Sequence, residues 1–336
     1  MKEFLAIFAA RNKEFYRDKG SLSWSFIFPI LIIIICAFAF ANPDKTLFKV
    51  GTIGNQDEMT SLALMQQPFV EPIVFTDLDQ ALKRIQHHQL DLLISIDGES
   101  KSYWINTESS SSLVAEQLFT HHDKNFTQQE TSGSKVRYVD WVIPGVLGMN
   151  LMFGALFGIG YVIVRYRQNG VLKRLQATPV SPLKFLSAQL VSRLIIVVSV
   201  NVIIFIGCNL FLDLIVVGSY ASLFLVTVLG GLAMISIGLL ISCRTANEEL
   251  AGGLLNIVSF PMMFVSEVWF SLDNAPEWLV SISNLVPLTH IVKATRSIMI
   301  DGAALADVSY HLISLVGVTI VCLGLSSFLF KWTTSD

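Results

Sequence analysis

The sequence predicts an α-helical polytopic membrane protein with six spans and a small α/β domain between spans 1 and 2. Apolar residues make up 53% of the 336 residues and charged residues only 15%, whereas a soluble domain carries about 25% charged residues. The shortage is local, because residues 42–139 have an ordinary soluble composition while long stretches elsewhere carry no charge. A membrane domain with one hydrophilic insert is therefore expected. The small net charge of −3 gives no indication of a nucleic-acid partner.

Six apolar runs are long enough, or nearly so, to cross a bilayer as a helix of roughly 20 residues. They are Trp24–Ala41, Trp141–Val164, Leu190–Val217, Ser219–Cys243, Leu250–Phe270 and Val308–Trp332. The fifth run is broken by Pro261 and carries Glu267, so it is expected to stop short of a full crossing. A cleaved signal peptide is the alternative for the first run, because Ala39-Phe40-Ala41 resembles a cleavage site. The long leader with its acidic residues favours an uncleaved anchor helix.

Basic residues in the short segments that flank the spans predict the orientation. They gather before span 1, between spans 2 and 3, and at the ends of spans 4 and 6. Six spans put all these segments on one side, so both termini are expected in the cytoplasm of a cell inner (plasma) membrane protein. The expected parts are a cytoplasmic interfacial helix (1–23), span 1 (24–41), an extracytoplasmic α/β domain (42–139) and a membrane domain (140–336). The membrane domain includes a cytoplasmic elbow (165–189) and an outer segment (271–307).

The N-terminal segment has the pattern of an amphipathic helix in the membrane interface. Leu5, Phe8, Asn12 and Phe15 share one helical face, and charged residues occupy most of the rest. A charged soluble tail is the alternative. It is less favoured because the aromatic residues recur at helical spacing.

The insert is expected to fold as an α/β unit with a β-α-β arrangement near its start. Alternating and helical patterns predict the elements: strands at Phe48–Ile53, Ile73–Thr76, Leu90–Ile96 and Lys101–Asn106, and helices at Leu78–His88 and from Ser109–Ser112 to about Phe126. Two histidine pairs, 87–88 and 121–122, suggest a metal site, but adjacent histidines on a helix point to different faces. We interpret them as solvated polar residues. The four cysteines lie in or at the ends of apolar runs, which favours buried small side chains over a disulfide or zinc site.

Motifs that carry chemistry are missing from the sequence. It has no phosphate-binding G-x-x-x-x-G-K-[ST] loop, no H-E-x-x-H and no G-x-S-x-G. No enzyme activity, cofactor or metal is therefore expected on this chain. Ionisable residues are almost absent from the apolar runs, which argues against an ion-coupled carrier. Arg193 lies near the end of the third run, where it is expected to snorkel.

Small and polar residues recur in two of the apolar runs. Gly154 and Gly158 have the spacing of closely packed membrane helices. The fifth run carries a flexible, mildly polar stripe made of Gly252, Gly253, Asn256, Ser259 and Pro261. This stripe is explained equally well by helix packing and by the lining of a pathway that opens and closes.

The segment between spans 2 and 3 predicts a helix–turn–helix elbow. Gly170 punctuates it, Val171–Gln176 forms a helical turn or two, and Pro179 ends that helix. Ser181-Pro182 then begins a second helix with proline in its first turn. The elbow is basic and free of acid, as a docking surface would be. Positive-inside topology alone explains the charges but not the two ordered turns.

Three segments, in order along the chain, resemble the ABC transporter type-2 permease family. Gly170–Pro182 (GVLKRLQATPVSP) resembles the family's elbow, which commonly reads G-T-L-E-R-L-x-A-T-P-V-S. Val142–Met149 resembles the P-G motif that opens the second span, and Asn284–His290 with Arg296 resembles the L-P-L-T-…-R segment before the last span. Departures are Gln168-Asn169, where the family often has an acid, and Val171, which replaces the usual threonine.

The resemblance implies an exporter made of two permease subunits, identical or related, and two separate ABC ATPase subunits that bind ATP and Mg. It implies that residues 271–307 fold as short re-entrant helices, and that the N-terminal helix and the elbow contact the ATPases. The residues it assigns to ATPase coupling are Gly170, Leu172, Arg174, Leu175, Thr178, Pro179 and Pro182. Candidates for a pathway or gate are Pro144, Gly145, Asn256, Ser259, Pro261 and Glu267.

The near absence of ionisable residues from the spans indicates an apolar or amphipathic cargo, such as a lipid, a drug or a hydrophobic conjugate. We expect this cargo to be moved outward. Two other functions stay open. A membrane-embedded enzyme would need convergent polar groups, and only His290, Lys293, Arg296 and Asp301 lie near each other in the sequence. A membrane-anchored binding or assembly protein, acting through its outer domain, fits everything except the ordered elbow. An envelope adaptor protein is a candidate partner of the outer domain, whose task stays open.

Overall fold

The computed structural model describes residues 2–39, 48–54, 59, 62–97, 100–122, 125–133, 136–272 and 275–330. The chain divides into two compact units. A helical unit contains Met1–Phe38 and Val139–Asp336, and an α/β unit contains Ala39–Tyr138.

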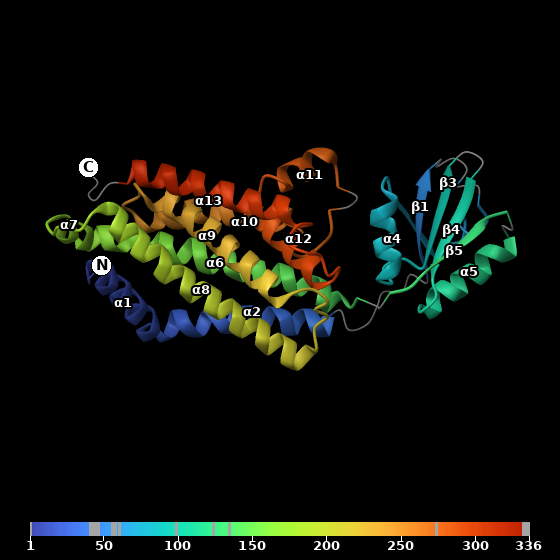
Figure 1. The fold of residues 1–336 in the computed structure, drawn as a ribbon, viewed down its shortest axis with the longest axis horizontal. Helices are drawn as coiled ribbons and strands as arrows, with labels where there is room; N and C mark the ends of the chain where they lie inside the picture. Colours follow the sequence, from blue (N-terminus) through green and yellow to red (C-terminus); the bar gives the residue numbers. More distant parts are fainter. Residues whose placement is uncertain are drawn as a thin grey trace. The chain divides into compact units, whose positions relative to one another are not determined.

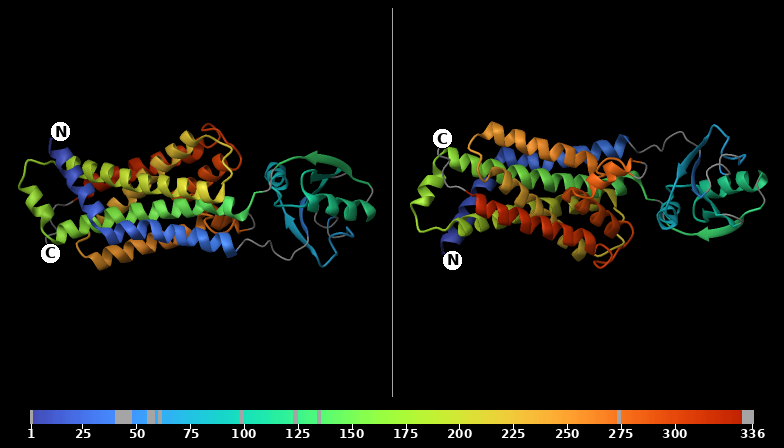
Figure 2. Two further views of the ribbon diagram at one scale, coloured as in Figure 1. Left: turned by 90° about the horizontal axis from the view of Figure 1, so that it is seen from below. Right: turned by 90° about the horizontal axis from the view of Figure 1, so that it is seen from above.

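Long apolar helices that run side by side build the helical unit (Figures 1 and 2). Five of them, within the described residues, are long and apolar enough to cross a membrane: α6 (Tyr138–Gln168), α8 (Pro182–Leu212), α9 (Tyr220–Ser242), α10 (Glu248–Val265) and α13 (Ser309–Leu329). The pair α1 (Lys2–Arg17) and α2 (Lys19–Ala39), bent by 60°, makes a sixth if it is counted as one span. The predicted polytopic helical fold is confirmed, with five or six candidate spans.

The central helix of this unit is α6, and its neighbours pack closely against it. A Cβ atom added to Gly145 would lie 2.6 Å from the carbonyl oxygen of Val268, and one added to Gly160 would lie 2.8 Å from Leu255 of α10. On α9, a Cβ atom at Gly238 would lie 2.8 Å from the carbonyl oxygen of Leu156. These glycines let backbone or side-chain atoms of neighbouring segments approach closely, as small residues do in membrane bundles.

Helix α10 differs from the prediction in two respects. Pro261 lies inside the helix and does not break it. The helix ends at Val265, before Glu267, but its 18 residues are long and apolar enough to cross a membrane, so the expectation that this run stops short of a full crossing is wrong. Two short helices follow, α11 (Glu277–Ser283) and α12 (Pro287–Met299), in the segment predicted to lie on the outer side. Span helix α2 begins at Lys19, five residues before the predicted start, so the helix extends beyond the apolar run at its N-terminal end.

Within the described residues, the α/β unit contains a five-stranded mixed sheet and the helices α4 and α5. Its elements are β1 (Phe48–Gly54), β2 (Val70–Val74), α4 (Leu78–Gln86), β3 (Leu92–Asp97), β4 (Ser100–Asn106), α5 (Ser110–His122) and β5 (Thr127–Thr131). The strand order is β2-β1-β3-β4-β5, with β2, β1 and β3 parallel to each other and β4 antiparallel to β3. The expected β-α-β arrangement is present as β2-α4-β3. Sequence reasoning missed β5 because its residues, TQQET, are polar and mostly exposed.

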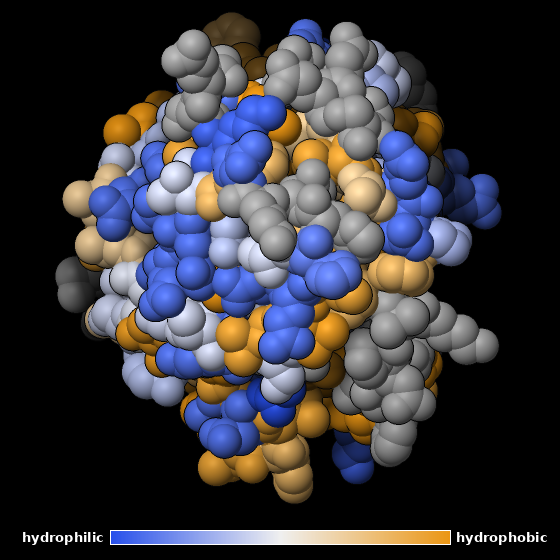
Figure 3. All heavy atoms as spheres, turned by 90° about the vertical axis from the view of Figure 1, so that its right-hand side faces the viewer, coloured by the Kyte–Doolittle hydropathy of each residue, from blue (hydrophilic) through white to orange (hydrophobic). Residues whose placement is uncertain are grey.

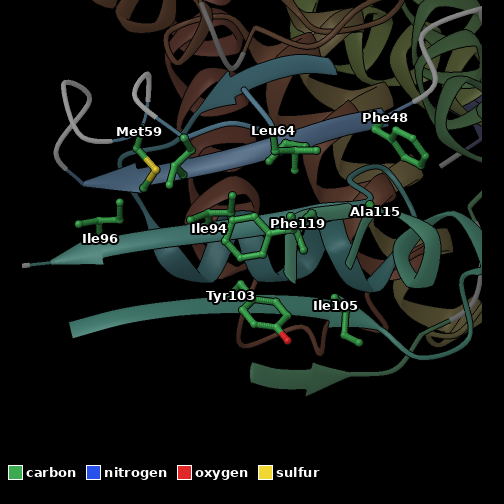
Figure 4. Packing of buried hydrophobic residues seen from close by; sticks show 12 residues of the cluster. Phe48, Met59, Leu64, Ile94, Ile96, Tyr103, Ile105, Ala115 and Phe119 are labelled. Atoms are coloured by element: carbon green, nitrogen blue, oxygen red, sulfur yellow. The ribbon is translucent and has the colours of Figure 1, made fainter. Parts of the chain in front are cut away.

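Alternation along the strands divides the apolar residues between the two faces of the sheet. On one face, Ile94 and Ile96 pack with Ala115 and Phe119 of α5 (Figure 4). On the other face, Leu93 packs with Ala81 and Ile85 of α4. The centre of the α/β surface drawn in Figure 3 is hydrophilic, with hydrophobic residues scattered around it. The unit thus has an ordinary water-facing surface and a core on each side of its sheet.

The loop after α4 shows that one histidine was misinterpreted. His88 has a φ of 57° and its Nε2 atom lies 2.6 Å from the carbonyl oxygen of Gly133, so it is not simply solvated. The Nδ2 group of the fully buried Asn106 donates to the carbonyl oxygens of Ile85, Gln86 and Gly133, at 3.1, 2.9 and 3.0 Å. Asn106 thereby joins the end of β4, the end of α4 and the segment after β5. The side chain of His122 lies outside the described residues.

Candidate functional site

The elbow consists of one short helix, α7 (Val171–Gln176), between the long helices α6 and α8. Gly170 joins α6 to α7 with a φ of 66°, a left-handed conformation that favours glycine. Leu172 is fully buried and anchors α7 to the bundle. Beyond α7, the Thr178 hydroxyl donates to the carbonyl oxygen of Leu175 at 2.6 Å. The N-terminus, α7 and the end of α13 lie at the same end of the helical unit (Figures 1 and 2).

The predicted coupling residues differ in what they present at the surface. Arg174, Thr178 and Pro179 are exposed, Gly170 and Leu175 are half-buried, and Leu172 is buried. The side chain of Pro182 lies outside the described residues. The second elbow helix is not separate, since α8 starts at Pro182 and continues without a break to Leu212. A partner can therefore contact Arg174 and Pro179 directly, whereas Leu172 acts by holding α7 in place.

Arg167, which sequence reasoning missed, connects the elbow to the rest of the bundle. It is 8% exposed and lies in the last turn of α6. Its guanidinium donates to the carbonyl oxygens of Ser242 at 2.9 Å and Cys243 at 2.8 Å, and also to that of Thr245. These carbonyl groups belong to the end of α9 and the turn that follows, where helical carbonyls lack partners of their own. Charge in the sequence could not distinguish Arg167 from its exposed neighbour Arg165.

Helix α1 is fastened to α6 and α8 by polar side chains. The Ser192 hydroxyl donates to Asn12 Oδ1 at 3.0 Å, and the Tyr166 hydroxyl donates to Glu14 at 2.5 Å. At the edge, Lys184 forms an ion pair with Glu3 at 3.0 Å. The helix predicted to lie in the membrane interface therefore also packs on the bundle beside the elbow.

The candidate pathway residues do not form one stripe. Pro144 and Gly145 are buried in α6. On α10, Ser259 is buried, while Asn256 and Pro261 are exposed on the outer side of the helix. The predicted stripe is therefore split, because a helix turns by 100° per residue and these positions point in different directions.

Glu267 lies in the turn after α10, with a φ of 54°. Its carboxylate forms ion pairs with Lys293 at 3.2 Å and Arg296 at 3.4 Å, both on α12. Arg296 also donates to the backbone carbonyl of Glu267 at 2.8 Å and lies 3.8 Å from the centre of the Trp141 ring. Glu267 is thus paired with two bases and not simply solvated at a helix end. The contacts join the end of α10, α12 and the start of α6.

Comparison with known families agrees with this architecture. A family model described as "ABC-2 family transporter protein" matches residues 19–328, which is nearly the whole chain. The chain belongs to the ABC-2 family of transporter proteins. The match includes the α/β unit, the elbow and the segment around α12.

Individual relatives of this ABC-2 chain are distant. It is 28% identical over 170 residues to "ABC transporter G family member 20" of Dictyostelium discoideum, and 25% identical over 171 residues to "Probable multidrug ABC transporter permease YbhR" of Escherichia coli (strain K12). Each match covers 50% of this chain, and they cover 23% and 46% of those relatives. "Probable multidrug ABC transporter permease YbhS" of the same organism is 18% identical over 358 residues, which covers 96% of this chain and 94% of the relative.

Neutralising Glu267 should loosen the α10–α12 connection of this ABC-2 permease. In Glu267→Gln both ion pairs are lost while the side chain keeps its size. Lys293 and Arg296 remain partly buried, at 28% and 12% exposure. The expected loss of stability is about 2 kcal/mol, the usual size for a hydrogen bond to a charged group. Thermal unfolding of the purified chain measures it. Glu277→Gln, at an exposed position of α11, is the matched control, and an equal effect of both variants would argue against the pairing.

Proposed function

We propose that this chain is the membrane-spanning permease subunit of an ATP-driven exporter, with ATP and Mg bound by a separate ABC ATPase. Family membership supports this proposal, because ABC-2 permeases work with an ABC ATPase partner and often form dimers. The observation that carries it is the ordered elbow, which projects Arg174 and Pro179 from the bundle while Leu172 anchors it. A loop that served only to connect two spans would not require a buried residue such as Leu172 to hold it against the bundle.

The proposed coupling route starts at the elbow and α1. An ATPase that closes on ATP pushes on the exposed side of α7, which is anchored by Leu172. Arg167 passes that displacement to the end of α9 and to the turn before α10, through its three carbonyl contacts. The basic residues of the elbow favour a cytoplasmic location for it, so we assign both termini to the cytoplasm. Outward transport is part of the same proposal.

The surface of α10 supports a second permease subunit as a partner. Asn256 is exposed there among Ile257, Phe260 and Phe264, which are 70%, 48% and 54% exposed. An amide that faces lipid lacks hydrogen-bond partners, which is costly in a bilayer. A second subunit or the transport pathway between two subunits would supply them, and Pro261 lies on the same helix.

An apolar or amphipathic cargo is consistent with the aromatic and apolar side chains that line the surfaces of the helical unit. The rings of Phe153, Phe157 and Tyr161 follow one another along α6 with their centres 5.7 Å apart, and the ring of Phe260 of α10 lies 6.3 Å from that of Phe153. A groove of about 410 Å³ between α6, α8, α9 and α12 is lined mainly by apolar side chains, including Leu151 and Phe205. Two relatives are named as probable multidrug permeases, and a lipid, drug or hydrophobic conjugate is the cargo class proposed for this chain.

Co-purification with the ATPase encoded beside it, followed by ATP hydrolysis in lipid nanodiscs, tests the proposal. Pro179→Asp places a charge at the exposed tip of the elbow and should lower hydrolysis by the complex at least about tenfold, the effect of losing one strong interface contact. Ala306→Asp, an exposed site in the link between α12 and α13, is the matched control. Hydrolysis in that control should match the unaltered complex.

A stable complex whose hydrolysis depends on the elbow would support the exporter. If a folded, monodisperse chain bound no ATPase, the exporter proposal would fail. The α/β unit, as the binding module of an assembly protein, would then be the next function to test.

A further inference from the structure

Arg193 of α8 is a buried cation inside a candidate span. It lies nine residues after Lys184, the start of the span, and so about 14 Å along the helix axis. Its side chain is only 7% exposed. The expectation that Arg193 snorkels to the membrane surface is therefore wrong. We propose that Arg193 forms a binding site for the anionic headgroup of a bilayer lipid, between α1–α2, α6 and α8.

Two glycines of α6 make room for the guanidinium. Arg193 Nε donates to the carbonyl oxygen of Gly154 at 2.7 Å. A Cβ atom added to Gly158 would lie 1.7 Å from Arg193 Cζ, so no other residue fits there without moving the arginine. Gly158 therefore makes room for the charged side chain of Arg193. The interpretation of Gly154 and Gly158 as helix–helix packing residues alone is incomplete.

The partners of Arg193 do not neutralise its charge. They are a carbonyl group and the ring of Phe15, whose centre lies 5.6 Å from Cζ. Within the described part of the chain, Arg193 forms no ion pair with a carboxylate. Arg11, which donates to the Gly158 carbonyl at 3.4 Å, already pairs with the nearby Glu14 at 3.0 Å. Glu14 therefore pairs with Arg11 and not with Arg193, which leaves the charge of Arg193 uncompensated.

An uncompensated charge that is buried inside a helix bundle requires an explanation. Buried ions in proteins are normally paired, and ionisable residues inside membrane segments mark functional positions. The missing negative charge must come from outside this part of the chain. An anion bound next to Arg193 supplies it.

A cavity beside the guanidinium has the right size and polarity for one anionic oxygen. Its volume is about 20 Å³, enough for a single water-sized group. Asn150 and Asn201 line it, together with the apolar residues Ile196, Val197 and Val200. The Asn150 side chain forms no hydrogen bond with another described residue, so its amide is available to a ligand. A guanidinium and an amide around one oxygen position are typical donors for a phosphate group.

The surroundings favour a lipid over a soluble anion. The adjoining helix α2 exposes Ile27, Leu31 and Ile34, which are 52%, 50% and 50% exposed. Apolar side chains around a polar cavity suit a ligand whose headgroup is anionic and whose tails are hydrocarbon. The site is separate from the elbow, and its occupancy requires neither ATP nor an ATPase.

Native mass spectrometry of the full chain in neutral detergent tests this site. Phosphatidylglycerol and phosphatidylcholine with identical acyl chains are titrated as probes. The unaltered chain should prefer phosphatidylglycerol, and Arg193→Gln should weaken that binding roughly tenfold or more without changing phosphatidylcholine binding. Lys173→Gln removes one exposed charge from α7 and should leave both affinities unchanged. Equal phosphatidylglycerol binding by the unaltered chain and Arg193→Gln would overturn the proposal.

A second variant and a second probe keep the test decisive. Asn150→Leu removes the available amide and leaves the contacts of Arg193 with Gly154 and Phe15 in place. It should weaken phosphatidylglycerol binding several-fold, and unchanged binding in a folded Asn150→Leu chain would overturn the site even if Arg193→Gln does not fold. Inorganic phosphate should not compete with phosphatidylglycerol at equal concentration. Full competition would identify a soluble-anion site and contradict the lipid assignment.

Discussion

Arg167→Met is expected to destabilise the junction of α9 and α10 and to uncouple transport from ATP hydrolysis. Methionine retains an unbranched apolar stem like that of arginine but lacks the guanidinium that donates to the carbonyl oxygens of Ser242, Cys243 and Thr245. Each buried acceptor left without a partner costs about 1–3 kcal/mol, so a loss of about 3 kcal/mol or more is expected. Hydrogen exchange of the amides in residues 238–250 measures the local effect, and transport by the complex measures coupling.

Arg165→Met is the matched control for this result. Arg165 is half-exposed, and its single ion pair with Glu248 spans 3.7 Å. An exposed pair of this kind contributes about 1 kcal/mol or less. The two variants make the same chemical change two residues apart, so equal exchange and equal transport in both would contradict the role of Arg167.

Asn106→Asp is expected to unfold part of the α/β unit. The native amide donates to three carbonyl groups, and its Oδ1 atom accepts from the backbone N–H of Glu108 at 2.9 Å. A buried Asp carboxylate would lie against three carbonyl oxygens and could not donate a hydrogen bond to any of them. A protonated Asp could donate to only one of the three. Stability should fall by about 4 kcal/mol or more, the range of a buried network that is broken and left with an unpaired charge. Exchange of the amides of α4 and β4 in the full chain measures the effect.

Asn125→Asp makes the same substitution at an exposed position between α5 and β5. Surface changes of this kind usually alter stability by about 0.5 kcal/mol or less. If the Asn106 variant exchanged no faster than this control, Asn106 would not be holding α4 and the two strands together.

The periodicity of apolar residues along the sequence was sufficient to predict most helices and strands. Apolar runs of membrane length predicted the spans, and alternation predicted β1, β3 and β4 nearly to the residue. Such patterns work because an element must turn its apolar side chains toward one environment. They fail where an element has no apolar face, as in β5, which joins the sheet through backbone hydrogen bonds to β4. They also failed at Pro261, whose effect on a helix depends on what surrounds it.

The candidate site was predictable in part. Gly170 and Pro179 punctuate the elbow in the sequence, and the structure has α7 between them. The exposed or buried state of Leu172, Arg174 and Leu175 was not predictable, because a helix of six residues has no clear amphipathic period. The partners of Glu267 could not be predicted from the sequence. Lys293 and Arg296 follow it by 26 and 29 residues and contact it only because of the way α12 packs.

The sequence by itself determined that the chain is a helical membrane protein with a hydrophilic insert and a basic elbow. These properties depend on local composition and on the free energy of moving each segment from water into a bilayer. Only the tertiary structure decided which of several similar arginines are buried. Arg167 caps the end of α9, Arg193 occupies a slot against Gly158, and Arg165 stays exposed. The environment of a charge is set by neighbours that are distant in sequence, so its function is visible only once the helices are packed.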